Sequence, residues 1–298
     1  MKGLVIIVAI GILYESDEWS DYALCKYIND MGVTARLINL LEDNNEGEIL
    51  SCDLVVSRIF ASSVFRGHQK ALDRMPGIID MLRTNSIPMI NPYEAHFFEI
   101  SKEHSTNTLA RSGFPVPKVY GLFTPEQITR DAVLEYPCVV KPDCGGRTNY
   151  TYIVKDKTEL ARYMEDAPNI QYIAEEYIFP EYGYLTRIEV IGGSCKQILK
   201  RGVTENGLSA YHLGSTYAAY EDCNDRIKQA AVDIMGLLHI EAGSMDIIEN
   251  RNGFYVIDIN SVSNASADNI EMFGFDLIKE TAAYVVMRYL SRAVVIVH

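Results

Sequence analysis

Two apolar segments around a short polar break, residues 245–260, constrain the fold more than any other part of this chain. They read Met-Asp-Ile-Ile-Glu and Phe-Tyr-Val-Ile-Asp-Ile-Asn, separated by the break Asn250 to Gly253. This pattern predicts a β-hairpin. Because side chains alternate along a strand, Asp258 and Asn260 share one face. A three-residue loop ending in a bulged turn at Gly253 would place Asp246 directly opposite Asp258.

Two facing carboxylates repel each other, so this pairing is unfavourable on its own. A divalent cation reverses the sign of the interaction. The carboxylates of Asp246 and Asp258 and the amide oxygen of Asn260 are hard ligands that suit Mg²⁺. The alternative is the polar outer face of an ordinary hairpin, and other parts of the chain must decide between the two.

Composition excludes several classes of protein. The chain has 298 residues, 48% hydrophobic and 22% charged, which is typical of a globular protein with an ample core. Its net charge of -13 argues against nucleic acid as the main partner. The six cysteines form no CxxC pair, which favours free thiols in the cytoplasm. No apolar run is long enough to span a bilayer, so no membrane partner is expected.

The pattern of apolar runs predicts three units: residues 1–97, 98–184 and 185–298. The first alternates strands and helices, which indicates a small open, mostly parallel sheet. Its expected strands are residues 3–10, 35–40, 54–59 and 87–90, and its expected helices are 19–31 and 65–84.

The later units mix strands and helices in a different order. A helix from Tyr93 to Ser112 is expected to lead into the second unit, and it ends before Gly113 and two prolines. Strands are expected at 118–123, 136–141, 150–154, 172–177, 185–191 and 195–201, and helices at 158–166, 225–238 and 275–291.

Lys141 lies at the end of an apolar strand, just before a glycine-rich segment, Gly145-Gly146-Arg147-Thr148. A lysine beside such a loop can hold phosphate oxygens, with the loop amides as further donors. It is not a Walker loop, because the lysine precedes the glycines. The alternative is a solvated lysine at a strand end.

Two further segments could bind a nucleotide. The strand that ends in Glu176-Tyr177-Ile178 could offer backbone groups to an adenine edge, although an ordinary strand would look the same. Four basic residues precede the hairpin and could balance triphosphate charge, the alternative being surface charges. They are Arg187, Lys200, Arg201 and His212.

In order and spacing, these motifs are similar to one family over nearly the whole chain. The chain resembles the ATP-grasp superfamily and, within it, the RimK-like carboxylate–amine ligases. The implied fold class is α/β (α+β): a small N-terminal sheet domain followed by two α+β subdomains that clamp ATP. The resemblance runs through Asp53 to Ile59, Asn91-Pro92, Ser101-Lys102, Leu109 to Pro117, Val139 to Pro142, Gly145-Gly146, Glu176 to Ile178, Arg187, Lys200-Arg201, Ser209 to Gly214, Asp246, Asp258 and Asn260-Ser261.

The resemblance implies a role for each matched residue. Lys102, Lys141 and Lys200 would contact ATP, and residues 145–148 would close over its phosphates. Glu176 to Ile178 would bind adenine. Arg187 and Arg201 would stabilise the transferring phosphate, with His212 as a candidate base. The metal ligands would be Asp246, Asp258 and Asn260, and Arg58 would shape the substrate site.

The sequence also departs from the family pattern. Leu185 stands where relatives often carry an acidic residue, so ribose recognition would pass to Glu181 or be weaker. Ala210 and Leu213 replace a common asparagine and arginine, and Arg147 is unusual in its loop. Nucleotide binding is still expected with these changes, but the substrate identity of relatives does not carry over, and Arg147 suggests a different substrate.

The resemblance implies ATP-dependent amide formation through an acyl phosphate, with ADP and phosphate released. ATP and one or two Mg²⁺ ions are the expected cofactors, and Mn²⁺ could replace Mg²⁺. The expected substrates are a small-molecule carboxylate and an amine, or a peptide or carrier protein. Two alternatives remain: a thiol acceptor, or a regulatory protein that binds ATP without turnover. A cytoplasmic homo-oligomer, dimer or tetramer, is expected.

Overall fold

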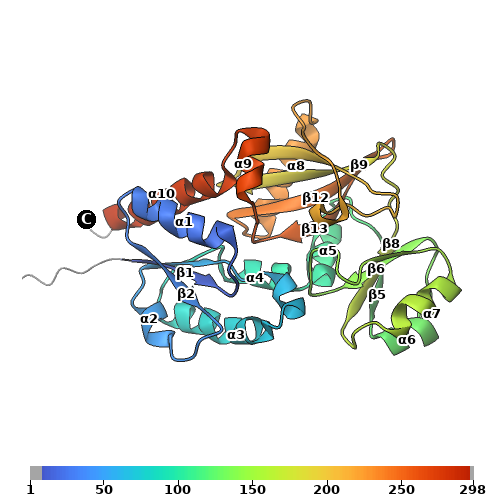
Figure 1. Cartoon of the computed structure of the whole chain (residues 1–298), viewed down its shortest axis with the longest axis horizontal. Helices are drawn as coiled ribbons and strands as arrows, with labels where there is room; N and C mark the ends of the chain where they lie inside the picture. The colour runs from blue at the N-terminus through green and yellow to red at the C-terminus, as the bar shows by residue number, and fades with distance from the viewer. Residues whose placement is uncertain (1–8, 296–298) are drawn as a thin grey trace, which may run out of the picture.

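The computed structural model describes residues 9–295, which form three sheets (Figure 1). One sheet is parallel and two are antiparallel, as the predicted α/β (α+β) class requires. The larger apolar clusters lie on both faces of the parallel sheet and on one face of each antiparallel sheet, and a small fifth cluster lies on the pocket side. The uncovered faces of the two antiparallel sheets line one pocket.

The parallel sheet has the strand order β2-β1-β3-β4. Helices α1 and α10 cover one face, while α2 and α3 cover the other (Figure 1). The C-terminal helix therefore packs on the N-terminal sheet. The elements are β1 (Ile10–Tyr14), α1 (Trp19–Asp30), β2 (Ala35–Asn39), α2 (Glu46–Leu50), β3 (Leu54–Ser57), α3 (Gln69–Thr84), β4 (Met89–Ile90) and α10 (Leu277–Val295), with a 3₁₀ helix, η1, at Ala61–Phe65.

The first strand differs from its predicted position at residues 3–10. Residues 1–8 lie outside the described part of the chain, and β1 begins at Ile10. Ile10 to Tyr14 pair in register with β2, and Ile10 to Leu13 pair with β3. As a result, residues 15–18 form the connection at the carboxyl edge of the sheet, where polar side chains of neighbouring strands meet.

The predicted helix from Tyr93 to Ser112 is wrong as a single helix. It is divided into α4 (Tyr93–Ile100) and α5 (Lys102–Arg111). Ser101 has extended backbone, and its side chain accepts a hydrogen bond from the amide of His104 at 3.1 Å. This N-cap satisfies one of the free amides of α5. The break makes Lys102 the first residue of α5.

The central sheet has the order β5-β8-β6-β7 and is antiparallel. Alternate residues of its strands, including Val140 and Ala174, pack with α6 and α7. The intervening residues face the pocket. The elements are β5 (Val119–Phe123), α6 (Pro125–Arg130), β6 (Cys138–Pro142), β7 (Tyr152–Val154), α7 (Lys157–Glu165) and β8 (Tyr172–Glu176).

The C-terminal sheet has the order β11-β10-β9-β12-β13. One face packs on α8, and its opposite face carries the polar residues of the hairpin. The elements are β9 (Tyr184–Ile191), β10 (Ser194–Gly202), η2 (Tyr211–Leu213), β11 (Tyr217–Ala219), α8 (Asp225–Leu237), β12 (Ala242–Asn250), β13 (Gly253–Asn260) and α9 (Ala267–Phe273). Across residues 9–295, none of the helices combines the length and apolar character that a bilayer crossing demands.

Candidate active site

The hairpin places Asp246 directly opposite Asp258, as the sequence predicts, but by a different local geometry. The turn has two residues, Arg251 and Asn252, because Asn250 pairs with Gly253. The extra residue is Ile257, which lies in the register shift between the pairs Ile247–Val256 and Asp246–Asp258.

The bulge at Ile257 decides which face Asp258 occupies. Phe254 and Val256 pack in the core with α8. Strict alternation would send Asp258 to that same face. The extra residue interrupts the alternation, so Asp258 instead lines the pocket with Asp246.

Asp246, on β12, is held by two arginines, Arg187 from β9 and Arg201 from β10. Arg201 Nη1 donates to both of its carboxylate oxygens at 3.0 Å, and Arg187 Nη1 donates to Oδ1 at 3.3 Å. Burial alone would raise the pKa of Asp246, but the charges of Arg201 and Arg187 outweigh it and lower that pKa below its ordinary value. Arg187 also donates to Glu189 and Ser244. The carboxylate is therefore ionised at neutral pH.

The oxygen atoms around Asp258 fit a divalent cation. The buried Oδ1 of Asp258 accepts no hydrogen bond from any described residue. The unpaired atom of Asn260 is its Nδ2, an N–H donor, so only the amide oxygen of Asn260 could bind a cation. Lys102 Nζ lies 3.7 Å from Asp258 Oδ1 and donates to the carbonyl of Gly145 at 2.8 Å. Buried polar atoms rarely stay unpaired. Within residues 9–295 no group of three or more His, Cys, Asp or Glu side chains gathers as a metal site. The predicted ligands include only two such side chains, the carboxylates of Asp246 and Asp258, together with the amide of Asn260.

Lys141 crosses from the central sheet to the hairpin. Its Nζ lies 2.8 Å from Glu175 Oε2 and donates to the Ile257 carbonyl at 2.8 Å. The bulge therefore also presents a backbone acceptor to this lysine. Burial alone would lower the pKa of Lys141, but Glu175 and then Asp258 outweigh it and raise that pKa. The ammonium stays charged inside the pocket.

The pocket between the two antiparallel sheets has a volume of about 150 Å³ and joins apolar and charged regions. Ile178, Leu185 and Ile248 form its apolar part with Ile257 and neighbouring residues. Such a slot accepts a flat ring between aliphatic side chains. The predicted nucleotide residues that line it are Lys102, Lys141, Gly145, Gly146, Arg147, Thr148, Glu176, Tyr177 and Ile178.

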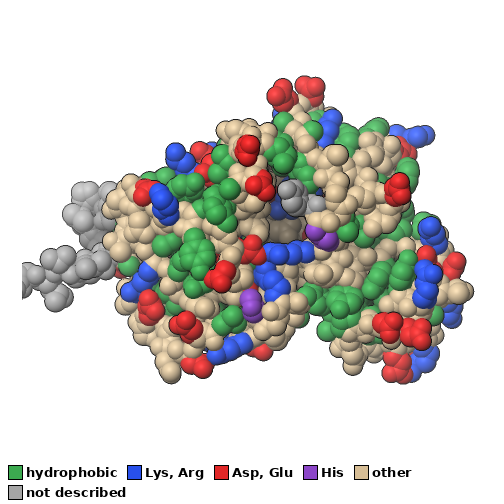
Figure 2. Space-filling view, viewed as in Figure 1, with side chains coloured by type: hydrophobic (Ala, Val, Ile, Leu, Met, Phe, Trp, Pro, Cys, Tyr) green, Lys and Arg blue, Asp and Glu red, His purple; other side chains and the backbone are tan. Residues whose placement is uncertain are grey.

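The glycine-rich loop, residues 144–150, lies at the mouth of this pocket. Its backbone at Arg147, Thr148 and Tyr150 is left-handed, with φ of 59°, 55° and 51°. Each such position costs a non-glycine residue roughly 1 kcal/mol. Thr148 Oγ1 lies 3.3 Å from His212 Nε2. Figure 2 shows acidic, basic and histidine side chains gathered around a hollow in the middle of the face that is turned toward the viewer.

Two predicted nucleotide residues are directed elsewhere. Lys200 pairs with Thr186, whereas Arg201 pairs with Leu185 on the pocket face. Lys200 therefore points to the opposite face, where its Nζ lies 4.7 Å and 4.1 Å from the ring centres of Tyr184 and Tyr220. Adjacent strand residues face opposite ways, so Lys200 points away from the pocket in this geometry, and its contact with the nucleotide stays a prediction.

Glu181, the predicted ribose ligand, binds the hairpin turn. Its Oε2 accepts from the backbone amide and from Nε of Arg251, both at 3.0 Å. These bonds lower the pKa of Glu181. The preceding Pro180 lines the pocket, but Glu181 does not.

Arg58, the predicted substrate residue, is buried and engaged through all three nitrogens. It donates to Asp21, Ser20 and the Ser263 carbonyl, each at 2.7 Å. It also lines a small cavity of about 20 Å³ between the parallel and C-terminal sheets. Arg58 thus joins the N-terminal sheet to the segment that follows β13.

Several acidic residues at the site were not predicted from the sequence. Glu175 neutralises Lys141, and Glu189 orients Arg187. Glu99 is fully buried and accepts from the amides of Ala61 and Ser261, which ties η1 to the end of the hairpin. Burial raises the pKa of Glu99. The signal for Glu175 was present, since an acidic residue at an inward position of a buried strand needs a partner.

Comparison with known proteins identifies the class. A family model described as the RimK-like ATP-grasp domain matches residues 100–285. The chain belongs to the RimK-like ATP-grasp family, which confirms the resemblance seen in the sequence.

Two curated relatives are ligases or synthases by name. The chain is 31% identical over 140 residues to a D-alanine–D-alanine ligase of Pediococcus pentosaceus, which covers 43% of this chain and 39% of that protein. It is 24% identical over 186 residues to beta-citrylglutamate synthase B of Homo sapiens, covering 59% and 46%. The matched region spans less than half of each relative.

Solved structures share the fold over almost the full chain. A RimK domain ATP-grasp protein from Sphaerobacter thermophilus superposes with a TM-score of 0.68 at 16% identity, covering 93% of this chain and 99% of that one. The ATP-grasp ligase PsnB, complexed with a minimal precursor, Mg and ADP, gives 0.64 at 15% identity, covering 93% and 97%. At these identities the likeness shows the fold alone, and it confirms the ATP-grasp prediction.

Proposed function

We propose that this chain is an ATP-dependent carboxylate–amine ligase, which forms an amide through an acyl phosphate and releases ADP and inorganic phosphate. The observation that carries the proposal is that acidic and basic side chains lie together around one partly apolar pocket. These side chains are Asp246, Asp258, Lys102, Lys141, Arg187 and Arg201.

The proposed nucleotide position follows from the two regions of the pocket. The adenine ring would lie among Ile178, Leu185 and Ile248, with the backbone of residues 176–178 at its edge. The phosphates would extend toward Lys102 and Lys141. Both lysines are held by backbone carbonyls and carboxylates, so they are positioned before the nucleotide arrives.

Asp246, Asp258 and Asn260 would hold the metal. When bound, Mg²⁺ would neutralise charge on the β- and γ-phosphates. The buried Oδ1 of Asp258 has no hydrogen-bond partner among the described residues and suits this role, and the amide oxygen of Asn260 would be the third ligand. Asp246 would take part while still bonded to Arg187 and Arg201, which fix its position.

The proposed reaction has two steps. A carboxylate oxygen of the substrate attacks the γ-phosphorus, the bond to the β-γ bridging oxygen breaks, and ADP leaves. An amine nitrogen then attacks the carbonyl carbon of the acyl phosphate, inorganic phosphate leaves, and the ammonium proton is released. Arg187 and Arg201 stabilise the charge on the transferring group. His212, beside Thr148 at the mouth, is the candidate to accept the proton.

A screen for ADP release tests the proposal. Candidate acids are offered with amine acceptors and, in parallel, with thiols, and products are identified by mass spectrometry. Short peptides belong in the screen, because PsnB was solved with a precursor peptide. Acceptor-dependent ADP release with an amide product supports the ligase. ATP binding without ADP release under every condition would favour the non-catalytic alternative.

A further inference from the structure

We propose that Arg147 and Glu18 form a latch that holds the loop at residues 144–150 against the N-terminal sheet and so keeps water from the acyl phosphate. This role rests on the proposed function. Arg147 lies in the central unit and Glu18 in the β1–α1 connection, 129 positions apart in sequence. Both are positioning residues, because they act through the loop.

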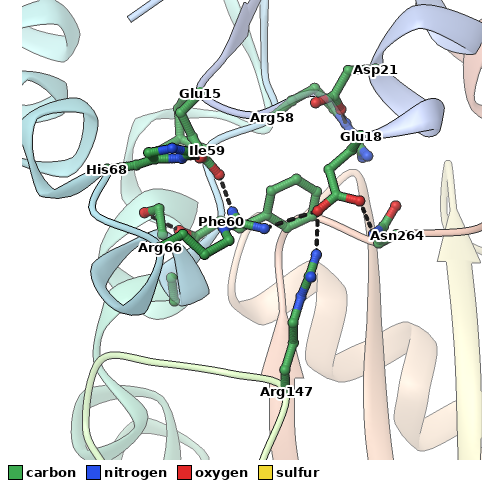
Figure 3. Close-up of polar contacts among 12 residues, drawn as sticks. Glu15, Glu18, Asp21, Arg58, Ile59, Phe60, Arg66, His68, Arg147 and Asn264 are labelled. Carbon is green, nitrogen blue, oxygen red and sulfur yellow. Dashed lines mark hydrogen bonds and ion pairs between the residues drawn. The ribbon is translucent and has the colours of Figure 1, made fainter. Parts of the chain in front are cut away.

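The carboxylate of Glu18 collects donors from three separate segments (Figure 3). Arg147 Nη2 and Arg66 Nη1 both pair with its Oε1, the second at 2.9 Å. Asn264 Nδ2, from the segment after β13, donates to Oε2 at 3.1 Å. One side chain thus joins the glycine-rich loop, the end of η1 and the exit of the hairpin.

Glu15, a second carboxylate beside this junction, already has partners of its own. Glu15 pairs with Arg66 through Oε1, and its Oε2 lies 2.5 Å from His68 Nδ1 (Figure 3). Arg66 is therefore shared between two carboxylates, which leaves Glu18 with negative charge to attract Arg147. Burial alone would raise the pKa of Glu18, but Arg147, Asn264 and Arg66 outweigh it and lower that pKa.

The side chain of Glu18 is not used by the helix that it precedes. Glu18 is the N-cap residue of α1, and its side chain makes no capping hydrogen bond. Glutamate is not among the usual capping residues, which are Ser, Thr, Asp, Asn and Gly. Its carboxylate is instead directed toward Arg147, Arg66 and Asn264.

The loop reaches Glu18 by packing closely on η1. A Cβ at Gly145 would lie 2.6 Å from Phe65 Cε2, and one at Gly146 would lie 3.3 Å from Ser62 Cβ. The rings of Tyr150 and Phe65 are 5.2 Å apart. Only glycine permits this approach at residue 145, where φ is also +157°. The glycine-rich loop therefore already packs on η1 without the ion pair. The pair between Arg147 and Glu18 adds a contact at the outer edge of that packed surface.

The latch is suited to repeated opening. The side chain of Arg147 is 48% exposed and that of Glu18 is 22% exposed. An ion pair this exposed shifts the ratio of closed to open loop by about two- to fivefold, and it does not lock the loop. Substrates can thus enter and products leave, and closure of the loop between the two chemical steps limits the access of water.

Hydrogen–deuterium exchange of amides 146–151, with Mg²⁺ and a non-hydrolysable ATP analogue, tests the latch directly. Exchange should be about two- to fivefold faster in Arg147→Ala and in Glu18→Gln, and the double variant should be no faster than the faster single variant. Arg162→Ala is the matched control, because Arg162 pairs with Glu159 and lies over the ring of Tyr163, both on its own helix. Wild-type exchange in the single variants, or additive effects in the double variant, would overturn the latch.

The ratio of ADP released to amide formed provides a second readout. It should rise in Arg147→Ala and Glu18→Gln and stay at the wild-type value in Arg162→Ala. Faster exchange with an unchanged ratio would overturn the role in water exclusion. If wild-type protein forms no amide with any substrate, the ligase proposal fails, while the exchange experiment still decides whether the latch exists.

Discussion

Asp258 faces Asp246 across the β12–β13 hairpin because Ile257 is an extra residue in β13. The bulge turns Asp258 from the core toward the pocket and presents the Ile257 carbonyl to Lys141. A single backbone irregularity therefore positions a carboxylate, a lysine and Asn260 together. Bulges that re-aim side chains are common beside active sites.

Replacing Asp258 tests the metal assignment. Asp258→Ala should lower kcat at least about a hundredfold, because it removes a cation ligand. Its thermal midpoint should equal or exceed that of wild type, since the change also removes the repulsion from Asp246. ADP release and thermal unfolding are measured, with the exposed Asp225→Ala as control. Wild-type turnover in Asp258→Ala would contradict the assignment.

Two adjacent residues of β10 should behave oppositely. Arg201→Gln should reduce kcat/KM by about a hundredfold, because it withdraws a charge from Asp246 and from the transferring phosphate. Lys200→Gln should keep the KM for ATP within about twofold and lose only about 0.5–1 kcal/mol of stability with its ring contacts. Steady-state kinetics and urea unfolding distinguish them. A large rise in KM for ATP in Lys200→Gln would place Lys200 at the nucleotide after all.

Lys141 has both a structural and a binding role, and the two can be separated. Lys141→Met should cost about 3 kcal/mol of stability, because it leaves Glu175 buried without its partner. The double variant Lys141→Met/Glu175→Gln should recover most of that loss. Neither variant should bind ATP normally in calorimetry. Normal ATP affinity in the stable double variant would show that Lys141 is structural only.

Asp21 should make stability depend on pH in an unusual direction. Burial raises its pKa to about 6 despite the ion pair with Arg58. Between about pH 4 and pH 6 the native state then holds a proton that the unfolded chain has released, so stability falls as the pH rises. Relative to wild type, Asp21→Asn should gain about 2–3 kcal/mol from pH 4 to pH 7. Urea unfolding across this range measures the difference, and a pH-independent difference would contradict the shift.

The sequence was sufficient where local patterns decide structure. Alternation, the turn residues and the acidic positions of the hairpin predicted that Asp246 opposes Asp258. The sequence attributed the extra residue to the turn at Gly253, whereas it is Ile257, because either site restores the same pairing. The strand predicted at residues 3–10 falls mostly outside the described residues and meets β1 only at Ile10, because residues 3–14 are apolar throughout. Hydrophobicity alone does not say which part pairs with β2.

Relationships between distant residues were beyond local patterns. Lys200 and Arg201 are both basic, and only the register of β10 with β9 shows which one faces the pocket. Glu18 and Arg147 belong to different units. The sequence predicts Arg147 as part of the phosphate loop, but no local pattern connects it to Glu18. Their pairing depends on how the glycine-rich loop packs on η1, which is tertiary information.

The most direct test of the central account is product analysis after incubating the protein with Mg²⁺, ATP, a carboxylic acid and an amine. The account predicts ADP, inorganic phosphate and an amide with the combined mass of acid and amine less one water. It also predicts that Asp258→Ala forms them at least about a hundredfold more slowly. Release of AMP and pyrophosphate, or amide formation by Asp258→Ala at the wild-type rate, would contradict it.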